Sequence, residues 1–133
     1  MKNWLLILLV MLPTIGLCEW QTYSRSDDQG AISYEDNFAF KNGMPVTWLV
    51  YKFKIIQKDE SGRFLYDTAH ERVMFDCAAL EMARLEQQFY LDSKKQYAIP
   101  AGELPVVMRG VFPETLDYFT LSRVCTTIKE IKK

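Results

Sequence analysis

The segment "VMFDCAALEMARLEQQFY", residues 73–90, decides how the chain folds, because it begins like a strand and continues like a helix. In its first part Val73, Phe75 and Cys77 fall on one face of an extended backbone, which predicts a strand. The part "AALEMARLEQQ" is rich in Ala, Leu, Glu, Gln and Arg, all of which favour helix. Propensity taken by itself favours a helix over residues 78–88, whereas a strand there would bring charged residues onto the face of Cys77.

The chain before this segment alternates between short β-like runs and turn signals. The predicted strands are "WQTYS", "AISYE", "FAFK", "VTWLVYKFKII", "RFLYD" and "HERVMFDC". The predicted turns are "DDQG", "KNGMP", "KDESG" and "DTAHER", and the Asn42-Gly43 pair is a strong hairpin signal. Such close spacing leaves no room for βαβ crossovers, so the strands should form an antiparallel meander. One face of the longest run carries Leu49, Tyr51, Phe53 and Ile55.

The C-terminal stretch "FPETLDYFTLSRVCTTIKEIKK", residues 112–133, has a helical pattern. Pro113 followed by an acidic residue is typical of a helix start, and lysines near the end suit the helix dipole. An apolar stripe at helical spacing consists of Leu116, Phe119, Val124, Ile128 and Ile131. We therefore expect a helix that closes the fold and lies on the sheet, with Cys125 near the edge of its apolar stripe.

The N-terminus has the layout of a secretory signal peptide over residues 1–18. Lys2 supplies a positive charge, "WLLILLVML" is an apolar run that ends at Pro13, and small residues follow. The run is shorter than the ~20 apolar residues that a membrane-spanning helix needs. Residues 19–133 of the 133-residue chain are therefore predicted to form a single exported domain.

The chain contains three cysteines, Cys18, Cys77 and Cys125. Cleavage after Cys18 would place Gly16 and Cys18 at the small-residue positions of the signal and would leave an even pair. The alternative is lipidation of Cys18, which Leu17 disfavours and which would be the protein's only means of membrane attachment. In either case Cys77 and Cys125 remain, and they are predicted to form a disulfide that ties the helix to the sheet in an oxidising compartment.

Composition and motifs exclude several function classes. The formal net charge of −1 and the pI of about 5.8 argue against a nucleic-acid partner, which would need a clustered basic face. The sequence contains no nucleophile motif, phosphate loop or spaced histidine cluster, so neither an enzyme nor a cofactor is predicted. The single histidine, His70, lies in a predicted turn and is expected to be exposed, and the cysteines lack the Cys-x-x-Cys spacing of a redox pair.

The remaining candidate residues also have structural explanations. The acidic pairs Asp27-Asp28 and Asp59-Glu60 could bind calcium, but they lack a spaced ligand loop and are expected to be solvated turns. Asp76 beside Cys77 is expected to pair with a strand cation such as Arg72. Four aromatic residues could line a ligand surface, although strand aromatics usually belong to the core: Trp20, Trp48, Tyr51 and Phe53.

Between Trp20 and Cys125 the chain resembles the surface-adhesin protein E family of Gram-negative bacteria. The resemblance rests on an ordered set of marks: Trp20 close behind the signal, "ISYEDNFAFKNG", "VTWLVYKFK", "LYDTAHERVMFDC", "RLEQQFY" and "FPETLDYFTLSRVC". It implies an α+β fold, a curved antiparallel sheet of about six strands with a C-terminal helix tied by a disulfide to one face. It also implies a strand over residues 78–90, and we follow it there, because tertiary context often overrides helix propensity.

The resemblance further implies a non-enzymatic binding protein of the cell envelope, in the periplasm or at the cell surface of a Gram-negative bacterium. Its partners would be host extracellular-matrix proteins such as vitronectin or laminin, and it could form a homodimer. The alternative is a periplasmic carrier of a small ligand, or an accessory protein, that uses the concave face of the sheet. In both cases recognition is expected through a sheet face or a sheet edge rather than through a catalytic pocket.

Overall fold

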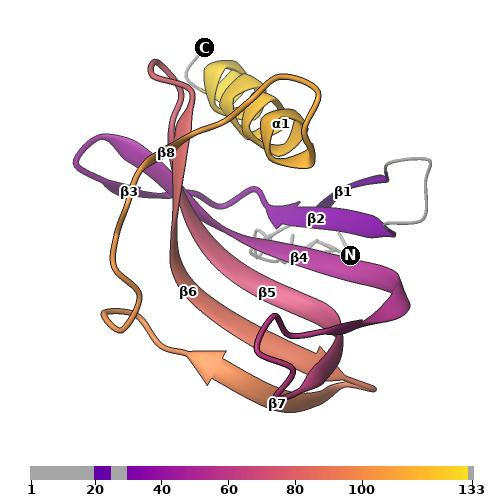
Figure 1. Ribbon diagram of the computed structural model, residues 1–133. Helices are drawn as coiled ribbons and strands as arrows, with labels where there is room; N and C mark the ends of the chain where they lie inside the picture. The colour runs from indigo at the N-terminus through magenta and orange to yellow at the C-terminus, as the bar shows by residue number, and fades with distance from the viewer. Residues whose placement is uncertain (1–19, 25–29, 132–133) are drawn as a thin grey trace, which may run out of the picture.

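The computed structural model describes residues 20–24 and 30–131, so the predicted signal peptide, Cys18 and the Asp27-Asp28 pair lie outside the described residues. The elements follow one another as β1 Trp20–Ser24, β2 Ala31–Glu35, β3 Ala39–Lys41, β4 Met44–Lys58, β5 Leu65–Asp76, β6 Glu81–Leu91, β7 Lys94–Ile99, β8 Arg109–Gly110 and α1 Leu116–Ile131. This confirms the predicted α+β class, with an antiparallel sheet followed by a C-terminal helix (Figure 1).

The strands form one curved sheet. Its continuous order is β1-β2-β4-β5-β6-β7, while the short strands β3 and β8 pair with β4 and β6, and every pairing is antiparallel. The predicted hairpin at Asn42-Gly43 is confirmed, because both residues have positive φ and join β3 to β4. Figure 1 shows the sheet curling so that α1 crosses one end of its concave side.

The disputed segment forms a turn and then a strand. The Asp76 carboxylate accepts hydrogen bonds from the backbone N–H groups of Ala78 and Ala79 at 3.1 and 3.0 Å, and Leu80 has a positive φ of 55°. From Glu81 onward the chain pairs with β5 as β6. The predicted strand is therefore confirmed over Glu81–Leu91, because pairing with a neighbouring strand outweighs the local preference for helix.

A bulge in β6 sets which of its side chains face the helix. Arg72 pairs with Glu86 and Val73 with Arg84, so Leu85 is an extra residue opposite β5. Leu85 packs in the small core cluster on the convex face, and the bulge leaves Arg84 and Gln87 together on the concave face. The alternation of faces along this strand is therefore interrupted at Leu85.

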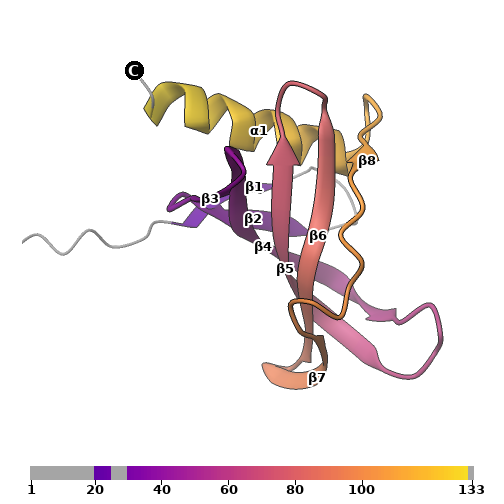
Figure 2. The same ribbon diagram turned by 90° about the vertical axis from the view of Figure 1, so that its left-hand side faces the viewer.

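The main core lies between the sheet and α1. Its sheet side includes Leu49, Val73 and Phe75, each fully buried, and the buried helix residues are Thr120, Leu121, Val124, Cys125 and Ile128. Val124 and Ile128 belong to the predicted stripe, but Phe119 and Ile131 are 46% and 63% exposed, so the stripe was wrong at those two positions. The buried side of α1 is the side that packs in the main core. Figure 2 shows α1 crossing the upper ends of β5 and β6.

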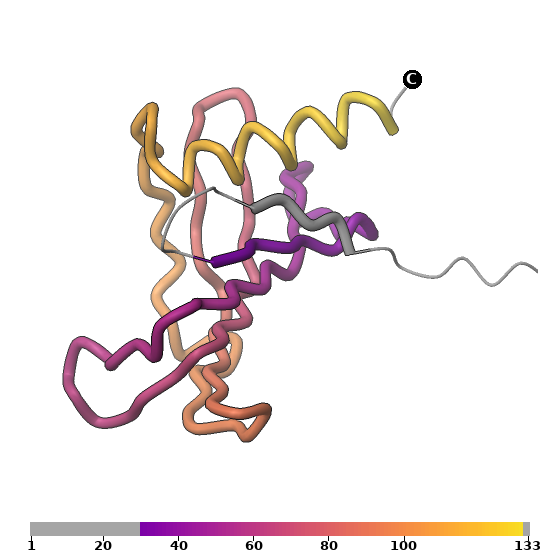
Figure 3. The backbone as a smooth tube through the Cα atoms, turned by 90° about the vertical axis from the view of Figure 1, so that its right-hand side faces the viewer, coloured from indigo at the N-terminus to yellow at the C-terminus, as the bar shows by residue number. Residues whose placement is uncertain are grey.

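The predicted disulfide is confirmed: Cys77 and Cys125 are bonded, with their Cα atoms 5.8 Å apart. Cys77 follows β5 at the turn into β6, and Cys125 is on the buried side of α1. The bridge therefore fastens the helix to one end of the sheet. The β4–β5 loop lies at the opposite, lower end (Figure 3).

The predicted turn at "DTAHER" was wrong. Residues 67–72 continue β5 without interruption, and His70 pairs with Val50 of β4 and Gln88 of β6. Because strands flank this stretch on both sides, its backbone groups find partners in the sheet even though its sequence lacks a clear strand pattern. His70 is consequently half-buried rather than an exposed turn residue.

Candidate functional site

A cavity of about 440 Å³ opens on the concave face between the start of α1 and the β4–β5 loop, residues 59–64. This volume falls in the range of roughly 300–1,000 Å³ that is usual for small-molecule sites. The lining residues come from four strands, the loop and the first turn of the helix: Tyr51, Phe53, Asp59, Glu60, Arg63, Phe64, Tyr66, Ala69, Glu71, Arg84, Gln87, Phe89, Tyr97, Ile99, Leu116 and Asp117.

One part of the cavity wall is aromatic, and Phe64 lies at its centre. The ring of Phe64 is 5.1 Å from the rings of both Phe89 and Tyr97, measured between centroids, and 5.9 Å from that of Tyr66. Tyr66 also meets Phe89 at 4.9 Å and Phe53 at 5.7 Å, both edge to face. Such contacts between rings fix their positions and give the wall a defined shape.

The β4–β5 loop is held in place by its own polar groups. Asp59 N–H donates to the carbonyl of Phe64 at 3.0 Å, and the Asp59 carboxylate accepts a hydrogen bond from the hydroxyl of Ser61. That hydrogen bond, followed by the charge of Arg63, lowers the pKa of Asp59. The Arg63 side chain donates to Ser61 Oγ at 2.6 Å and lies 5.1 Å above the ring of Tyr97. These contacts keep Phe64 over the sheet.

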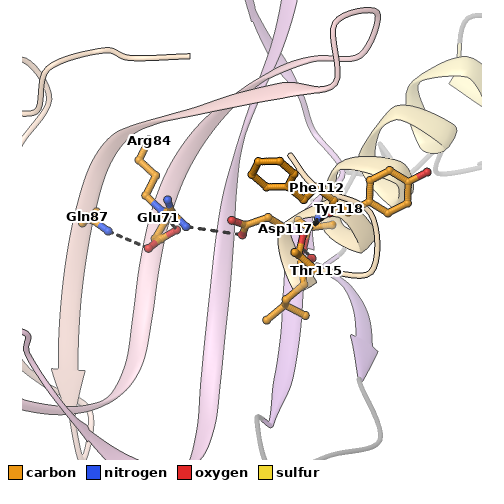
Figure 4. A network of polar contacts seen from close by, with 9 residues as sticks. Glu71, Arg84, Gln87, Phe112, Thr115, Asp117 and Tyr118 are labelled. Carbon is orange, nitrogen blue, oxygen red and sulfur yellow. Dashed lines mark hydrogen bonds and ion pairs between the residues drawn. The ribbon is translucent and has the colours of Figure 1, made fainter. Parts of the chain in front are cut away.

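The other part of the wall is a polar network centred on Glu71, which is 8% exposed (Figure 4). Its Oε2 atom accepts a hydrogen bond from Nε of Arg84 at 2.8 Å, and its Oε1 atom accepts one from Nε2 of Gln87 at 2.8 Å. Nη2 of Arg84 lies 3.7 Å from Oδ1 of Asp117 on the helix. A buried carboxylate with a partner for each oxygen is a stable feature of the site.

The first turn of α1 brings Asp117 to this network. Thr115 caps the helix: its Oγ1 accepts a hydrogen bond from Tyr118 N–H at 3.2 Å and donates to the Phe112 carbonyl at 2.6 Å (Figure 4). The sequence suggested that the helix begins at Pro113. It begins instead at Leu116, because the Thr115 cap fixes its start. Asp117 in the first turn also suits the positive end of the helix dipole.

Two titratable groups show how charge is distributed in the cavity. The pKa of Tyr66 is raised, first by burial and then by the negative charges of Glu71, Asp59 and Glu60. Burial lowers the pKa of Arg84, but the charge and hydrogen bond of Glu71 outweigh it and leave the pKa raised overall. The phenol of Tyr66 thus lies in a negative field, and the guanidinium of Arg84 is neutralised by its partners.

A second cavity of about 340 Å³ lies on the other side of the Arg84–Asp117 pair, beside the segment that connects β7 to the helix. Arg84, Gln87 and Asp117 line both cavities. Arg109 and Val107 belong to the second cavity alone. The polar network therefore forms a partition between the two spaces.

The structure places the residues singled out by sequence in different regions. Tyr51 and Phe53 line the cavity and also contact the main core, while Trp48 lies on the opposite face of β4. His70 lies between the lining residues Ala69 and Glu71 and so points away from the cavity, where its ring meets Tyr90 at 4.8 Å.

The structure also locates the acidic and cysteine candidates. Asp59 and Glu60 line the cavity, Asp76 caps the turn before β6, and Cys77 and Cys125 have no thiol because they are bonded to each other. No group of three His, Cys, Asp or Glu side chains among the described residues is placed to hold a metal ion. In the same residues, no helix combines the length and the apolar character needed to span a membrane.

Sequence reasoning did not find the network of Glu71, Arg84 and Gln87, nor Phe64 and Tyr97. One signal was present: in a strand, Glu71 lies on the same face as Val73 and Phe75, so its carboxylate had to fall on the buried face.

Comparison of the chain with protein-family models, with curated proteins and with solved structures found no match.

Proposed function

We propose that the protein is a non-enzymatic binding protein of the bacterial cell envelope that holds its partner in the cavity on the concave face. The observation that carries the proposal is the cavity itself, which combines a fixed aromatic wall with a polar network around the buried carboxylate of Glu71. Glu71, Arg84 and Asp117 are engaged with one another, which suits recognition more than proton transfer. The single histidine, a frequent general base, points to the opposite face.

The envelope location is supported by two independent features. Residues 1–18 have the layout of a signal peptide, and the Cys77–Cys125 disulfide belongs to a class of bonds that persist in oxidising compartments. The resemblance of the chain to the surface-adhesin protein E family suggests that the partner is a host extracellular-matrix protein such as vitronectin or laminin. A segment of such a protein would lie across the concave face and insert a side chain into the cavity.

A second candidate function is a periplasmic carrier of a small ligand. It is favoured by the volume of the cavity, about 440 Å³, which would enclose a small molecule without any larger partner. The two candidates differ in where the protein must be. An adhesin has to be exposed at the cell surface, whereas a carrier can function in the periplasm.

The deciding experiment combines localisation with a matched pair of variants. Intact cells are labelled with a reagent that cannot cross the outer membrane, and purified protein is tested for binding to immobilised vitronectin and laminin. Tyr97→Ala removes a ring from the cavity wall, and Tyr90→Ala removes the same side chain from a position outside the cavity. Melting temperatures of both variants show whether a loss of binding follows from a loss of fold.

For an adhesin we expect surface labelling, matrix binding by wild type and by Tyr90→Ala, and at least a tenfold loss for Tyr97→Ala, since buried aromatic contacts dominate binding energy at interfaces. Absence of labelling together with a ligand-induced rise in melting temperature would favour the carrier. Equal binding by Tyr97→Ala and wild type would show that the cavity is not the site.

A further inference from the structure

We infer that the cavity takes an alkylammonium group, that is, an organic cation on an aliphatic stem. The inference rests on the proposed function, because it names the chemistry recognised at the same cavity. Three features of the cavity support it: the net charge of its lining, the carboxylate partners of its guanidinium groups and the position of its aromatic rings.

The lining of the cavity is acidic. Four carboxylates, of Asp59, Glu60, Glu71 and Asp117, face two guanidinium groups, of Arg63 and Arg84, so the lining has a net charge of −2. Among the residues that the structure describes, no lysine or histidine lines the cavity. A site of this composition repels an anionic ligand and attracts a cationic one.

Both guanidinium groups already have carboxylate partners, which weakens their attraction for an incoming anion. Arg84 is bound to Glu71 at 2.8 Å and lies 3.7 Å from Asp117. Arg63 donates to Ser61, lies 3.7 Å from the Asp59 carboxylate and covers the ring of Tyr97. The positive end of α1, which could attract an anion, carries the carboxylate of Asp117 in its first turn.

The carboxylates are placed at two ends, with aromatic rings between them. Asp59 and Glu60 come from the β4–β5 loop, while Glu71 and Asp117 lie toward the helix, at the other end of the concave side (Figures 1 and 4). The pKa of Tyr66, on the aromatic wall, is raised first by burial and then by the negative charges of Glu71, Asp59 and Glu60. An aliphatic stem can therefore pack on the rings while its ammonium group meets a carboxylate.

The aromatic wall suits a cation for a second reason, because the faces of aromatic rings attract positive charge. The protein already uses one ring in this way, since the Arg63 guanidinium lies 5.1 Å from the centroid of Tyr97. Phe53, Phe64 and Phe89 supply further rings without a hydroxyl that would need a partner.

The test is calorimetric titration of the disulfide-bonded protein with three probes that share a five-carbon chain. The probes are 1,5-diaminopentane, which is cationic, 1,5-pentanediol, which is neutral, and glutarate, which is anionic. We expect heat of binding for the diamine only, with an affinity that falls as salt screens the carboxylates. Heat of binding for glutarate equal to or greater than that for the diamine would overturn the inference.

Two charge variants and a control locate the bound cation. Glu60→Gln and Asp117→Asn each remove one lining carboxylate charge, and each is expected to weaken diamine binding about fivefold, as a charge near the surface contributes about 1 kcal/mol. Glu86→Gln removes a carboxylate from the opposite face of β6 and should leave the affinity unchanged. Equal affinity of all four proteins for the diamine would contradict the assignment.

The source of the ammonium group is decided by competition. If the cation is a lysine side chain of a partner protein, a short lysine-containing peptide and the diamine will both displace immobilised matrix protein. If it is a free amine, the diamine will bind but the matrix protein will not. A partner that needs Tyr97 but is displaced by neither probe would leave the proposed function standing and refute the alkylammonium inference alone.

Discussion

Nε of Arg84 lies 2.8 Å from Oε2 of Glu71, although the two residues come from different strands and do not pair directly in the sheet. They meet because the bulge at Leu85 shifts Arg84 toward β5 and onto the concave face. Glu71 is buried, and its neighbours Arg84 and Gln87 supply both of its hydrogen bonds in the network. The stability of the site thus depends on one carboxylate and one irregularity in the sheet.

Replacing Arg84 should therefore destabilise the fold. In Arg84→Met, Glu71 keeps only the hydrogen bond from Gln87, and we expect the free energy of unfolding to fall by about 1–3 kcal/mol, the usual cost of a buried polar group that loses a partner. Urea unfolding measures it. Arg63→Met is the control, because its exposed ion pair should matter by less than about 0.5 kcal/mol. Equal effects would mean that the buried network adds nothing to stability.

The disulfide should contribute a large part of the stability. Cys77 and Cys125 are 48 positions apart, and closing a loop of that length in the unfolded chain corresponds to about 4 kcal/mol. The double variant Cys77→Ser/Cys125→Ser should therefore melt about 10–20 °C below the wild type. Peptide mapping without reductant should recover the linked pair from natively exported protein, and finding two free thiols would contradict the bond.

Two glycines with similar backbone angles should respond differently to alanine. Gly30 has φ +82°, and a Cβ placed there would lie 1.8 Å from the Lys52 carbonyl oxygen. Gly43 has φ +76°, and a Cβ placed there would meet no atom of the described residues within 4 Å. Gly43→Ala should cost about 1–2 kcal/mol of unfolding free energy from backbone strain alone. Gly30→Ala should cost more than about 3 kcal/mol, because a clash with backbone is added. Thermal or urea unfolding of both variants gives the comparison.

His70 should make stability depend on pH near neutrality. Burial, followed by the charges of Lys52 and Lys95, lowers its pKa from the ordinary value of 6.5. Between its folded and unfolded pKa values, His70 binds more protons in the unfolded chain than in the folded one. The contribution of neutral His70 to stability is therefore fully present above pH 6.5 and is lost as the pH falls through the folded pKa. Melting temperatures of wild type and His70→Gln should converge or cross between about pH 7.5 and 5.5. Parallel pH profiles would show that His70 titrates normally.

The fate of Cys18 is a prediction that mass spectrometry can test. We expect cleavage after Cys18, which gives a protein that begins at Glu19. Cleavage is favoured over lipidation because Leu17, directly before Cys18, makes a poor lipoprotein site. The intact mass of protein isolated from the envelope should match residues 19–133 with one disulfide. A diacylglyceryl mass on Cys18 would place the domain on a membrane through its lipid.

Much of the fold could be predicted from the sequence, because the relevant signals are local. Asn42-Gly43 marks a hairpin through its positive φ angles, and Leu49 and Tyr51 mark a buried strand face through their alternation. The rule of even cysteines identified the pair Cys77 and Cys125. In each case the residues that carry the signal are close in sequence or, like the cysteines, belong to a type that is rare in the chain.

The candidate site could not be predicted in the same way, because it depends on features that arise only on folding. The Glu71–Arg84 contact requires the register of two strands and a bulge that no residue type announces. Phe64 falls in the predicted strand "RFLYD" but lies in the loop before β5, and it reaches the cavity because that loop folds back over the sheet. His70 was misplaced because strand neighbours supply the pairing that its own segment does not suggest.

The bulge in β6 also restricts how this gene can vary in length. Because Leu85 is the extra residue, a chain that lost Leu85 alone would keep Arg84 opposite Val73, and Arg84 and Gln87 would both stay on the concave face. Removing both residues between the bulge and Gln87, Leu85 and Glu86, would make Arg84 and Gln87 neighbours and put them on opposite faces. We therefore expect that descendants of this chain which keep the cavity can lose one codon of β6 at the bulge but not two, and will change length freely only at turns that hold none of its wall.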